Sequence, residues 1–407
     1  MEKNKLKQFI REIPKCDLHV HLDGSLRVKT LIELAKKMKI KLPSYTEEGM
    51  NKLVFKDQYR DLPEYIQGFG YAIAVMQNPE NLERIAYEFA WDNINEGVCY
   101  VEVRFAPQFH INKYMNIEGV IEAVTKGMDK AKSEYNNTQD VVSGKFPSFE
   151  YGIISCAMRS IPLGVSDYFD KFIEVHSSSP SSRVNSLASY ELVLAMIKAR
   201  DNGLPLVGFD LAGVEAGFPA GEHRDAYALA HRNFFKKTVH AGEAYGAESI
   251  FQAITELHAD RIGHGYYLFS EEMIKSRIIK DKKEFINRLA QYIADRRITI
   301  EVCLTSNLQT NPKIGTIKDH SFRKMLDYKL STAICTDNRT VSKTTVSKEL
   351  ELAVKNFNLT ARELKNCMIY GMKRSFYPGS YIEKRGYVRH IIDFYEIVEA
   401  RYPDLLP

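Results

Sequence analysis

The stretch C-D-L-H-V-H-L-D-G-S, residues 16–25, is the part of the sequence that decides the fold. Side chains alternate between the two faces of a β-strand, so His19 and His21 are predicted to project from the same face. Leucine and valine alternate with them and are suited to burial, and the turn signal Asp23-Gly24 ends the strand. Two imidazoles are therefore expected side by side at the carboxyl end of a buried strand.

Neutral imidazole is the commonest metal ligand in proteins, but a catalytic zinc usually takes three protein ligands and keeps one position for water. His19 and His21 alone do not complete such a site. The ordinary alternative is that two of the eleven histidines of the chain happen to share a strand. Further ligands elsewhere in the sequence must decide between the two interpretations.

Composition limits the class of protein. A length of 407 residues permits one or two domains and lies within the range of an elaborated α/β barrel. The 56 basic and 52 acidic residues are mixed along the chain and leave a net charge of only +4, so a nucleic-acid partner is not expected. No run of about eighteen apolar residues is present, so a membrane span is not expected either.

The amino-terminal segment and the cysteines indicate a cytoplasmic protein. Residues 1–14 lack the apolar core of a signal peptide. Six cysteines are scattered singly, without a C-x-x-C pair, and most lie in apolar, strand-like runs. We interpret them as reduced, mostly buried thiols.

Eight strands alternate with helical patterns along the chain, which favours a single closed (β/α)8 barrel over a doubly wound sheet. We find no repeat or linker, so one domain is expected over residues 1–407, with outer helices in 348–402. The first strand is expected to begin directly after Pro14, and the others are expected at 98–105, 151–156, 206–211, 237–241, 261–263, 298–304 and 331–336. Helices are expected at 5–12, with Asn4 as its cap, and at 28–38, 81–95, 118–135, 189–200, 225–233, 249–258, 282–294 and 321–328.

Three segments do not follow this alternation. Residues 44–75 are irregular, and they contain Tyr65 and Phe69, which share one face if they lie on a helix. Core packing is the ordinary role of such rings, but a long segment after a strand that carries a site is typical of a lid. Residues 136–148 are expected to form a surface loop, and no role is assigned to the serine-rich stretch 176–182.

The working residues of a barrel lie at the carboxyl ends of its strands, and four strands of this chain end in such residues. The fifth ends V-H-A-G-E, with His240 and Glu243. The sixth ends G-H-G, with His264, and the eighth ends C-T-D-N, with Asp337. Considered singly, Glu243 would be interpreted as a helix cap and His264 as a polar residue with its hydrogen bonds made. Together with the histidines of the first strand, these strand ends predict a hydrolytic zinc site with an open position for water. The predicted ligands are His19, His21, His240 and Asp337; Glu102 and Asp210 are interpreted as structural.

In these motifs the chain resembles the adenosine deaminase family of the metal-dependent amidohydrolases. The resemblance spans nearly the whole chain: H-V-H-L-D-G-S, E-G-V-C-Y-V-E-V-R-F-A-P, D-L-A-G, T-V-H-A-G-E, R-I-G-H-G, E-V-C-L-T-S-N and C-T-D-N, in this order. It implies one zinc ion on the four predicted ligands, and Glu243 as the proton donor to N1 of the purine. It also implies that His264 and Asp337 orient the attacking water and accept its proton.

The resemblance also implies the substrate contacts. Asp23 is expected to bind the ribose 5′-hydroxyl, and the backbone N–H of Gly213 is expected to donate to purine N3. His21 is expected to contact both the metal and the substrate. Tyr65 and Phe69 match the lid helix that covers the sugar.

One position departs from the family pattern, in which two consecutive aspartates precede a proline. Here Asn338 and Arg339 follow Asp337. An aspartate must be protonated to donate to purine N7, whereas the amide of Asn338 donates at any pH. We expect Arg339 to add a charge near the pocket mouth, which leaves open a substrate with an acidic group on its 5′ side.

The function implied by the resemblance is zinc-dependent hydrolytic deamination of adenosine and 2′-deoxyadenosine in purine salvage, on a cyclic amidine C–N bond. The alternatives are free adenine or an adenosine with a larger 5′ group, such as aminodeoxyfutalosine. A growth-factor-like binding role is disfavoured, because the relatives that have it carry a signal sequence and extra segments. The sequence carries no signal of an oligomeric state.

Overall fold

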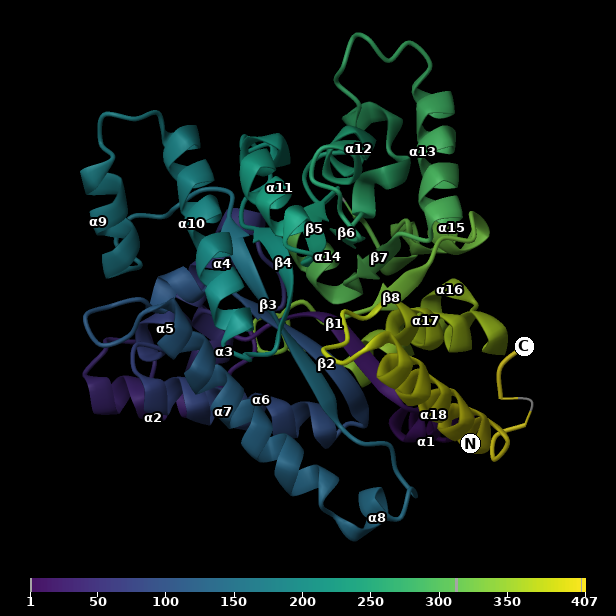
Figure 1. Cartoon of the computed structure of the whole chain (residues 1–407). Helices are drawn as coiled ribbons and strands as arrows, with labels where there is room; N and C mark the ends of the chain where they lie inside the picture. Colours follow the sequence, from purple (N-terminus) through teal and green to yellow (C-terminus); the bar gives the residue numbers. More distant parts are fainter. Residues whose placement is uncertain (1, 312–313, 404) are drawn as a thin grey trace.

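A computed structural model describes residues 2–311, 314–403 and 405–407, and its eight parallel strands pair in chain order around a barrel (Figure 1). The last strand returns to the first through Asp337, whose N–H donates to the carbonyl of His19 at 2.8 Å and whose carbonyl accepts from the N–H of His21 at 2.7 Å. The predicted (β/α)8 barrel is confirmed. The strands are β1 Lys15–His21, β2 Val98–Phe105, β3 Glu150–Met158, β4 Leu206–Ala212, β5 Lys236–Ala241, β6 Arg261–His264, β7 Thr299–Val302 and β8 Thr332–Ile334.

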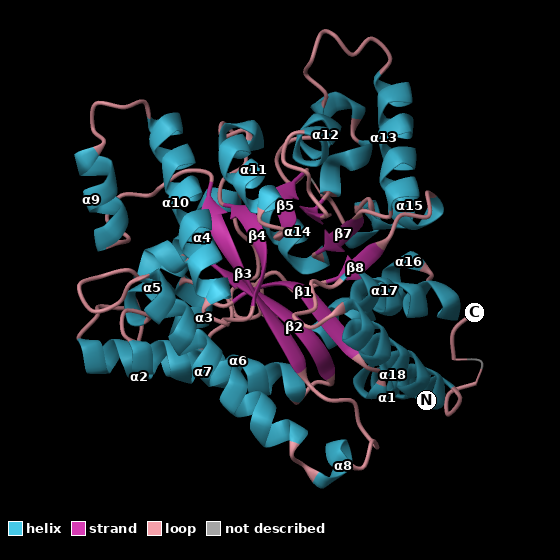
Figure 2. Ribbon diagram, viewed as in Figure 1, coloured by secondary structure: helices cyan, strands magenta, loops and turns pink. Residues whose placement is uncertain are grey.

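Helices surround these strands (Figure 2). The α-helices are α1 Glu2–Glu12, α2 Val28–Met38, α3 Glu47–Leu53, α4 Leu62–Gln67, α5 Phe69–Val75, α6 Pro79–Ile94, α7 Ile117–Asn136, α8 Gln139–Val142, α9 Asp167–Val175, α10 Ser181–Asp201, α11 Arg224–Arg232, α12 Ala247–Thr255, α13 Lys282–Arg296, α14 Leu304–Thr310, α15 Phe322–Asp327, α16 Val346–Phe357, α17 Ala361–Arg374 and α18 Tyr381–Glu399. Short 3-10 helices are η1 Pro107–His110, η2 Ala220–His223, η3 Tyr266–Phe269, η4 Glu271–Met273 and η5 Ile317–Asp319.

Several helices differ from the sequence prediction. Helix α1 begins at Glu2, so Asn4 lies inside it and is not its cap. Helix α10 begins at Ser181, within the serine-rich stretch, because Pro180 ends the preceding loop and serine is acceptable in the first turn of a helix. Helices α8, α9 and α14 were not predicted, and α14 takes Leu304 from the expected seventh strand.

The segment after α2 forms three short helices, and a break at Gly68 separates α4 from α5. Tyr65 therefore lies on α4 and Phe69 begins α5, so the expectation of one helix that carries both is wrong. The break still brings their rings together, with centroids 6.2 Å apart. Asp61 caps α4 by accepting the N–H of Glu64 at 2.9 Å, which fixes where this helix starts.

Helices α1 and α16–α18 pack outside the barrel, and the two ends of the chain lie side by side (Figure 1). The rings of Phe9 and Tyr402 have centroids 5.4 Å apart, which joins the ends. All six cysteines are buried and unpaired, as expected. In the described part of the chain, no helix is long and apolar enough to cross a membrane.

Candidate metal centre and active site

The four predicted ligands meet at the carboxyl end of the barrel. His19 and His21 come from β1, His240 from the end of β5, and Asp337 from the turn after β8, and their ligand atoms all lie within 4.8 Å of one another. Nε2 of His21 and Nε2 of His240 are 3.2 Å apart, and Oδ1 of Asp337 is 3.5 Å from Nε2 of His19 and of His21. Three imidazoles and one carboxylate thus face a common centre.

Two buried carboxylates orient these imidazoles from behind. Oε2 of Glu301 lies 2.8 Å from Nδ1 of His19, and Oδ1 of Asp210 lies 3.2 Å from Nδ1 of His240. With Nδ1 engaged, each ring presents Nε2 to the centre, as ligating histidines usually do. Among the described residues, Nε2 of His19 is buried without a hydrogen-bond partner, which suits a metal ligand. Asp210, interpreted as structural from the sequence, therefore contacts the centre, and Glu301 was missed.

The charges beneath the centre also fit a cation. A fully buried network of Glu102, Arg104, Asp210, Arg261 and Glu301 links the strands, with Arg104 donating to Asp210 and Glu301 at 2.9 and 3.0 Å. Its three carboxylates outnumber its two guanidinium groups, and Asp337 adds another carboxylate above it. A divalent cation would balance this excess. Glu102 contacts Arg261 and the chain after α17, away from the imidazoles, in agreement with a structural role.

The two predicted ligands on β1, His19 and His21, are in the neutral form that a metal requires. Burial, assisted by the positive charge of Arg104, holds the pKa of His19 well below its ordinary value. Burial, together with His240, does the same for the pKa of His21. Both rings are therefore neutral, with a lone pair available for coordination.

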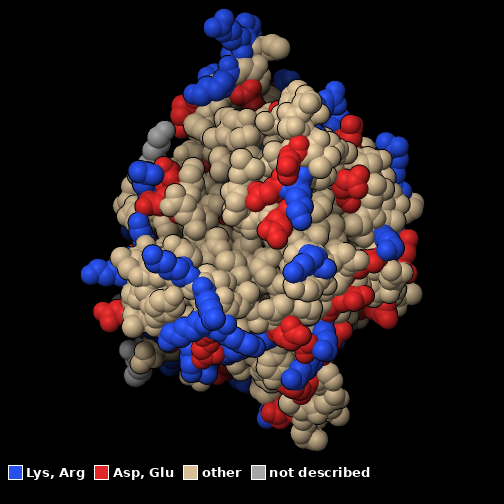
Figure 3. Space-filling view, turned by 90° about the vertical axis from the view of Figure 1, so that its left-hand side faces the viewer, with Lys and Arg blue, Asp and Glu red and all other residues tan. Residues whose placement is uncertain are grey.

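A cavity of about 400 Å³ opens above this centre, and the predicted substrate residues line it. Most of the rest of its wall is apolar, and no lysine or arginine is among the described residues that border it. Figure 3 looks onto the side of the molecule that carries α4, α5 and α9, which is hollowed near its centre where uncharged atoms predominate. The predicted site residues in the wall are His21, Asp23, Tyr65, Phe69, Gly213, His240, Glu243, His264, Asp337 and Asn338.

Glu243 is held in this wall by a residue that the sequence did not reveal. The carboxylate of Glu215 accepts the backbone N–H groups of four consecutive residues, 242 to 245, at 2.6 to 3.0 Å, and so fixes the loop after β5. The pKa of the Glu243 carboxyl is raised to about 7, mainly by burial; His240 opposes this shift and Glu215 adds to it. Glu243 can therefore carry a proton near neutral pH.

The tautomer of His264 follows from a chain of hydrogen bonds. The backbone N–H of Phe322 donates to Nδ1 of His320 at 3.0 Å, so the proton of His320 is on Nε2, which donates to Oδ1 of Asn307 at 3.2 Å. The amide nitrogen of Asn307 then donates to Nδ1 of His264 at 3.1 Å. This leaves the proton of His264 on Nε2, 3.8 Å from Oε2 of Glu243. Burial lowers the pKa of His264 to about 4, so the ring is neutral.

Asn338 faces both the lid segment and the cavity. Its amide nitrogen donates to the hydroxyl of Tyr65 at 2.8 Å, and that hydroxyl lies 2.7 Å from the hydroxyl of Ser342. One amide N–H of Asn338 is thereby used and the other is free to meet a ligand. A side chain at Gly24 would collide with Asn338, with only 1.7 Å between its Cβ and Oδ1, so this turn requires glycine.

Arg339 does not lie near the cavity mouth, and that expectation is wrong. Its guanidinium donates to Glu96 and to the side-chain oxygen of Asn93, at the end of α6, and its side chain is only 8% exposed. The argument from Arg339 for an acidic group on the substrate therefore does not hold.

Comparisons with known proteins agree with this geometry. The family model described as adenosine deaminase matches residues 14–393. An adenosine deaminase of Mycobacterium ulcerans is 34% identical over 370 residues, which cover 90% of this chain and 91% of the relative. A Burkholderia ambifaria amidohydrolase with bound zinc has a TM-score of 0.75 at 20% identity and 97% and 94% coverage. An Arabidopsis structure in complex with IMP has a TM-score of 0.72 at 24% identity and 95% and 98% coverage.

A (β/α)8 barrel with these groups at the carboxyl ends of its strands defines a hydrolase whose four clustered residues can hold a metal ion. The chain belongs to the adenosine deaminase family, because the family model covers most of its length and relatives of that name are more than 30% identical. It is a deaminase.

Proposed function

We propose that this chain catalyses the zinc-dependent hydrolytic deamination of adenosine and 2′-deoxyadenosine to inosine and deoxyinosine, with release of ammonia, in purine salvage in the cytoplasm. The observation that carries the proposal is the convergence of three imidazoles and a carboxylate beside Glu243 at the floor of one cavity. A single zinc ion on His19, His21, His240 and Asp337 would supply Lewis-acid activation of a water molecule near neutral pH.

The residues in the cavity wall suit an adenine nucleoside. We assign the backbone N–H of Gly213 to purine N3 and the free amide N–H of Asn338 to N7. Asp23 is assigned to the ribose 5′-hydroxyl, because its Oδ1 is buried without a partner among the described residues, and a hydroxyl donor would satisfy it. Tyr65 and Phe69 would cover the sugar from the lid segment.

The acid and base roles follow from the protonation states. Glu243 is assigned as the donor of a proton to purine N1, since burial favours its neutral carboxyl. Neutral His264 carries its proton on Nε2 and cannot accept another there, so we assign it as a hydrogen-bond donor to the attacking oxygen. Asp337 is then the residue that accepts the proton of the water. This assignment revises the shared role expected for His264 and Asp337.

The charge of the cavity favours a nucleoside over a nucleotide. A 5′-phosphate would lie near Asp23 with no lysine or arginine among the described wall residues to neutralise it. Burial raises the pKa of Asp23 to about 7, but a neutral carboxyl still supplies no positive charge. Free adenine would leave Asp23 without its hydroxyl partner.

A spectrophotometric screen tests the proposal directly. We expect the highest kcat/KM with adenosine and 2′-deoxyadenosine, and values lower by at least about a hundredfold with AMP and with adenine. Aminodeoxyfutalosine is included as an adenosine with a larger 5′ group. A preference for AMP, adenine or the 5′-extended nucleoside would contradict the substrate assignment, and no turnover of any of them by zinc-loaded protein would contradict the reaction.

A further inference from the structure

The opposite end of the barrel holds a second cavity of about 400 Å³, where the chain enters strands β5, β6 and β7. Lys236 opens β5, the strand that His240 closes to serve the metal centre. Four residues of rise along that strand, roughly 13 Å, thus separate the two ends. This second cavity, which we call the basic pocket, plays no part in the reaction proposed above.

Lysine and arginine are concentrated in the basic pocket. A chain with a net charge of only +4 places six of them here, together with the imidazoles of His231 and His258. Among the described residues, no carboxylate forms an ion pair with any of the six. Asp260, the one carboxylate among the described residues that border the pocket, is already bound by the backbone N–H and the ammonium of Lys237, at 2.8 and 3.2 Å. The six are Lys236, Arg296, Arg297, Lys373, Arg374 and Lys384.

Some arginines elsewhere on the surface form ion pairs. Arg288, on the same helix as Arg296, pairs with Glu284, and Arg389 pairs with Asp393. In the basic pocket the cations face one another instead. Burial lowers the pKa of Lys384 to about 8; Glu102 opposes this shift, and repulsion from Arg261, Lys236 and Arg374 adds to it. Burial and Arg297 likewise lower the pKa of Arg374. Burial is the main cause of both shifts, and repulsion between like charges adds to it.

We propose that the basic pocket binds a compact, multivalent phosphate anion, such as pyrophosphate or the diphosphate of a nucleotide. Three guanidinium groups can each bind a phosphate through paired N–H donors, and the lysines add point charges. The charges gather in one concave site and do not run in a stripe, which suits a small anion better than a nucleic-acid strand. The stacked imidazoles of His231 and His258, with centroids 4.7 Å apart, offer a flat face beside it.

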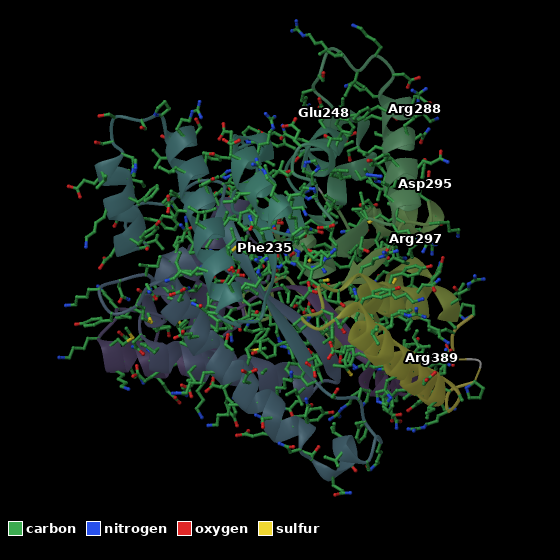
Figure 4. All side chains as sticks on the ribbon, viewed as in Figure 1. Phe235, Glu248, Arg288, Asp295, Arg297 and Arg389 are labelled. Atoms are coloured by element: carbon green, nitrogen blue, oxygen red, sulfur yellow. The ribbon has the colours of Figure 1, made fainter. Side chains whose placement is uncertain are left out.

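Calorimetric titration of the zinc-loaded protein with pyrophosphate at low ionic strength tests the proposal. The double variant Arg297→Gln/Lys373→Gln removes two exposed charges from the pocket and should weaken binding at least about tenfold. The matched variant Lys283→Gln/Arg389→Gln removes one lysine and one arginine from other sites, and its affinity should stay within about twofold of the parent's. Figure 4 labels Arg297 at the inner end of α13 and Arg389 on α18.

A third variant excludes binding at the metal centre, because pyrophosphate also coordinates zinc. His240→Ala should retain the affinity, since it lies at the other end of the barrel. Loss of binding in His240→Ala but not in Arg297→Gln/Lys373→Gln would overturn the proposal, as would equal weakening in both double variants or no binding by the parent.

A comparison of pyrophosphate with ADP identifies the source of the phosphate. Equal affinities would support a site for the phosphate groups alone. Tighter binding of ADP, with the same dependence on Arg297 and Lys373, would support a nucleotide whose base contacts the stacked imidazoles. Binding of neither anion contradicts the site.

Discussion

The two ends of the barrel hold cavities of the same volume and opposite charge. The cavity at the carboxyl end contains imidazoles and carboxylates and no described lysine or arginine, whereas the basic pocket at the amino end gathers six of them. One strand, β5, runs from Lys236 in the basic pocket to His240 in the metal centre. In these two cavities, the lysines and arginines thus lie at the amino ends of the strands, and the predicted metal ligands lie at the carboxyl ends.

The two ends of β5 give the sharpest test of this comparison. His240→Ala should abolish activity and lose the metal, because it removes one of the three imidazoles that would hold the zinc. Lys236→Gln, at the other end of the same strand, should keep about one zinc per chain and the parent's activity. Metal analysis and an adenosine assay of the two purified variants check both. Full activity of metal-free protein would show that these four residues do not form a catalytic metal centre.

The next largest effect is expected at Glu243. Glu243→Gln keeps the shape but cannot deliver a proton, so kcat should fall by at least about a hundredfold while zinc stays bound. The carboxyl is active when protonated, and burial raises its pKa to about 7, so the parent's kcat/KM should decline as the pH rises and the proton is lost. The variant should lack this basic limb. An active Gln variant with the same pH profile would remove Glu243 from the mechanism.

A smaller effect, on zinc affinity, is expected to distinguish Glu301 from Glu102, the two buried carboxylates that bind Arg261. Glu301 holds Nδ1 of His19, and Glu102 touches no ligand. Glu301→Gln should therefore weaken zinc binding by about tenfold to a hundredfold, and Glu102→Gln should lower thermal stability without changing zinc affinity. Competition with a chelator and thermal unfolding measure the two quantities. Equal zinc affinities in both variants would show that Glu301 serves only the barrel interior.

The smallest expected effect concerns Asn338. If its free N–H donates to N7, then 7-deazaadenosine should be roughly tenfold poorer than adenosine, from a loss of about 1 to 3 kcal/mol. Asn338→Asp donates only when protonated, so its activity should shift toward lower pH. Steady-state kinetics across pH with both substrates test this. Equal turnover of the two nucleosides would show that Asn338 does not donate to N7 and that its amide serves only the contact to Tyr65.

The sequence predicted the elements that depend on local pattern. All eight strands were recovered, and the four predicted ligands lie together, because apolar runs end in histidine or aspartate at the same edge of the barrel. The single domain over residues 1–407 remains a prediction. Helix α9 was missed although its sequence is amphipathic, and the break between α4 and α5 was missed although it falls at a glycine, Gly68.

The supporting residues of the site could not be predicted in the same way. Asp210 and Glu301 lie on strands whose other residues are mostly apolar, and a single buried carboxylate there is typical of a structural role. Only closure of the barrel brings them against Nδ1 of His240 and His19. Glu215 acts on a loop 27 residues away in the sequence. The G-V-E-A-G stretch after the fourth strand was the available signal, since it follows the D-L-A-G motif directly.

The closure of the barrel by Asp337 has a consequence for biosynthesis. The ribosome makes His19 and His21 first and Asp337 last, after roughly 300 further residues, or about 15 to 60 s at about 5–20 residues per second. During that time the nascent chain carries an open pair of imidazoles and no complete site. Asp337 forms both backbone hydrogen bonds that join the last strand segment to β1. A metal bound by these four residues would therefore gain its last ligand from the same residue that closes the barrel, near the end of translation.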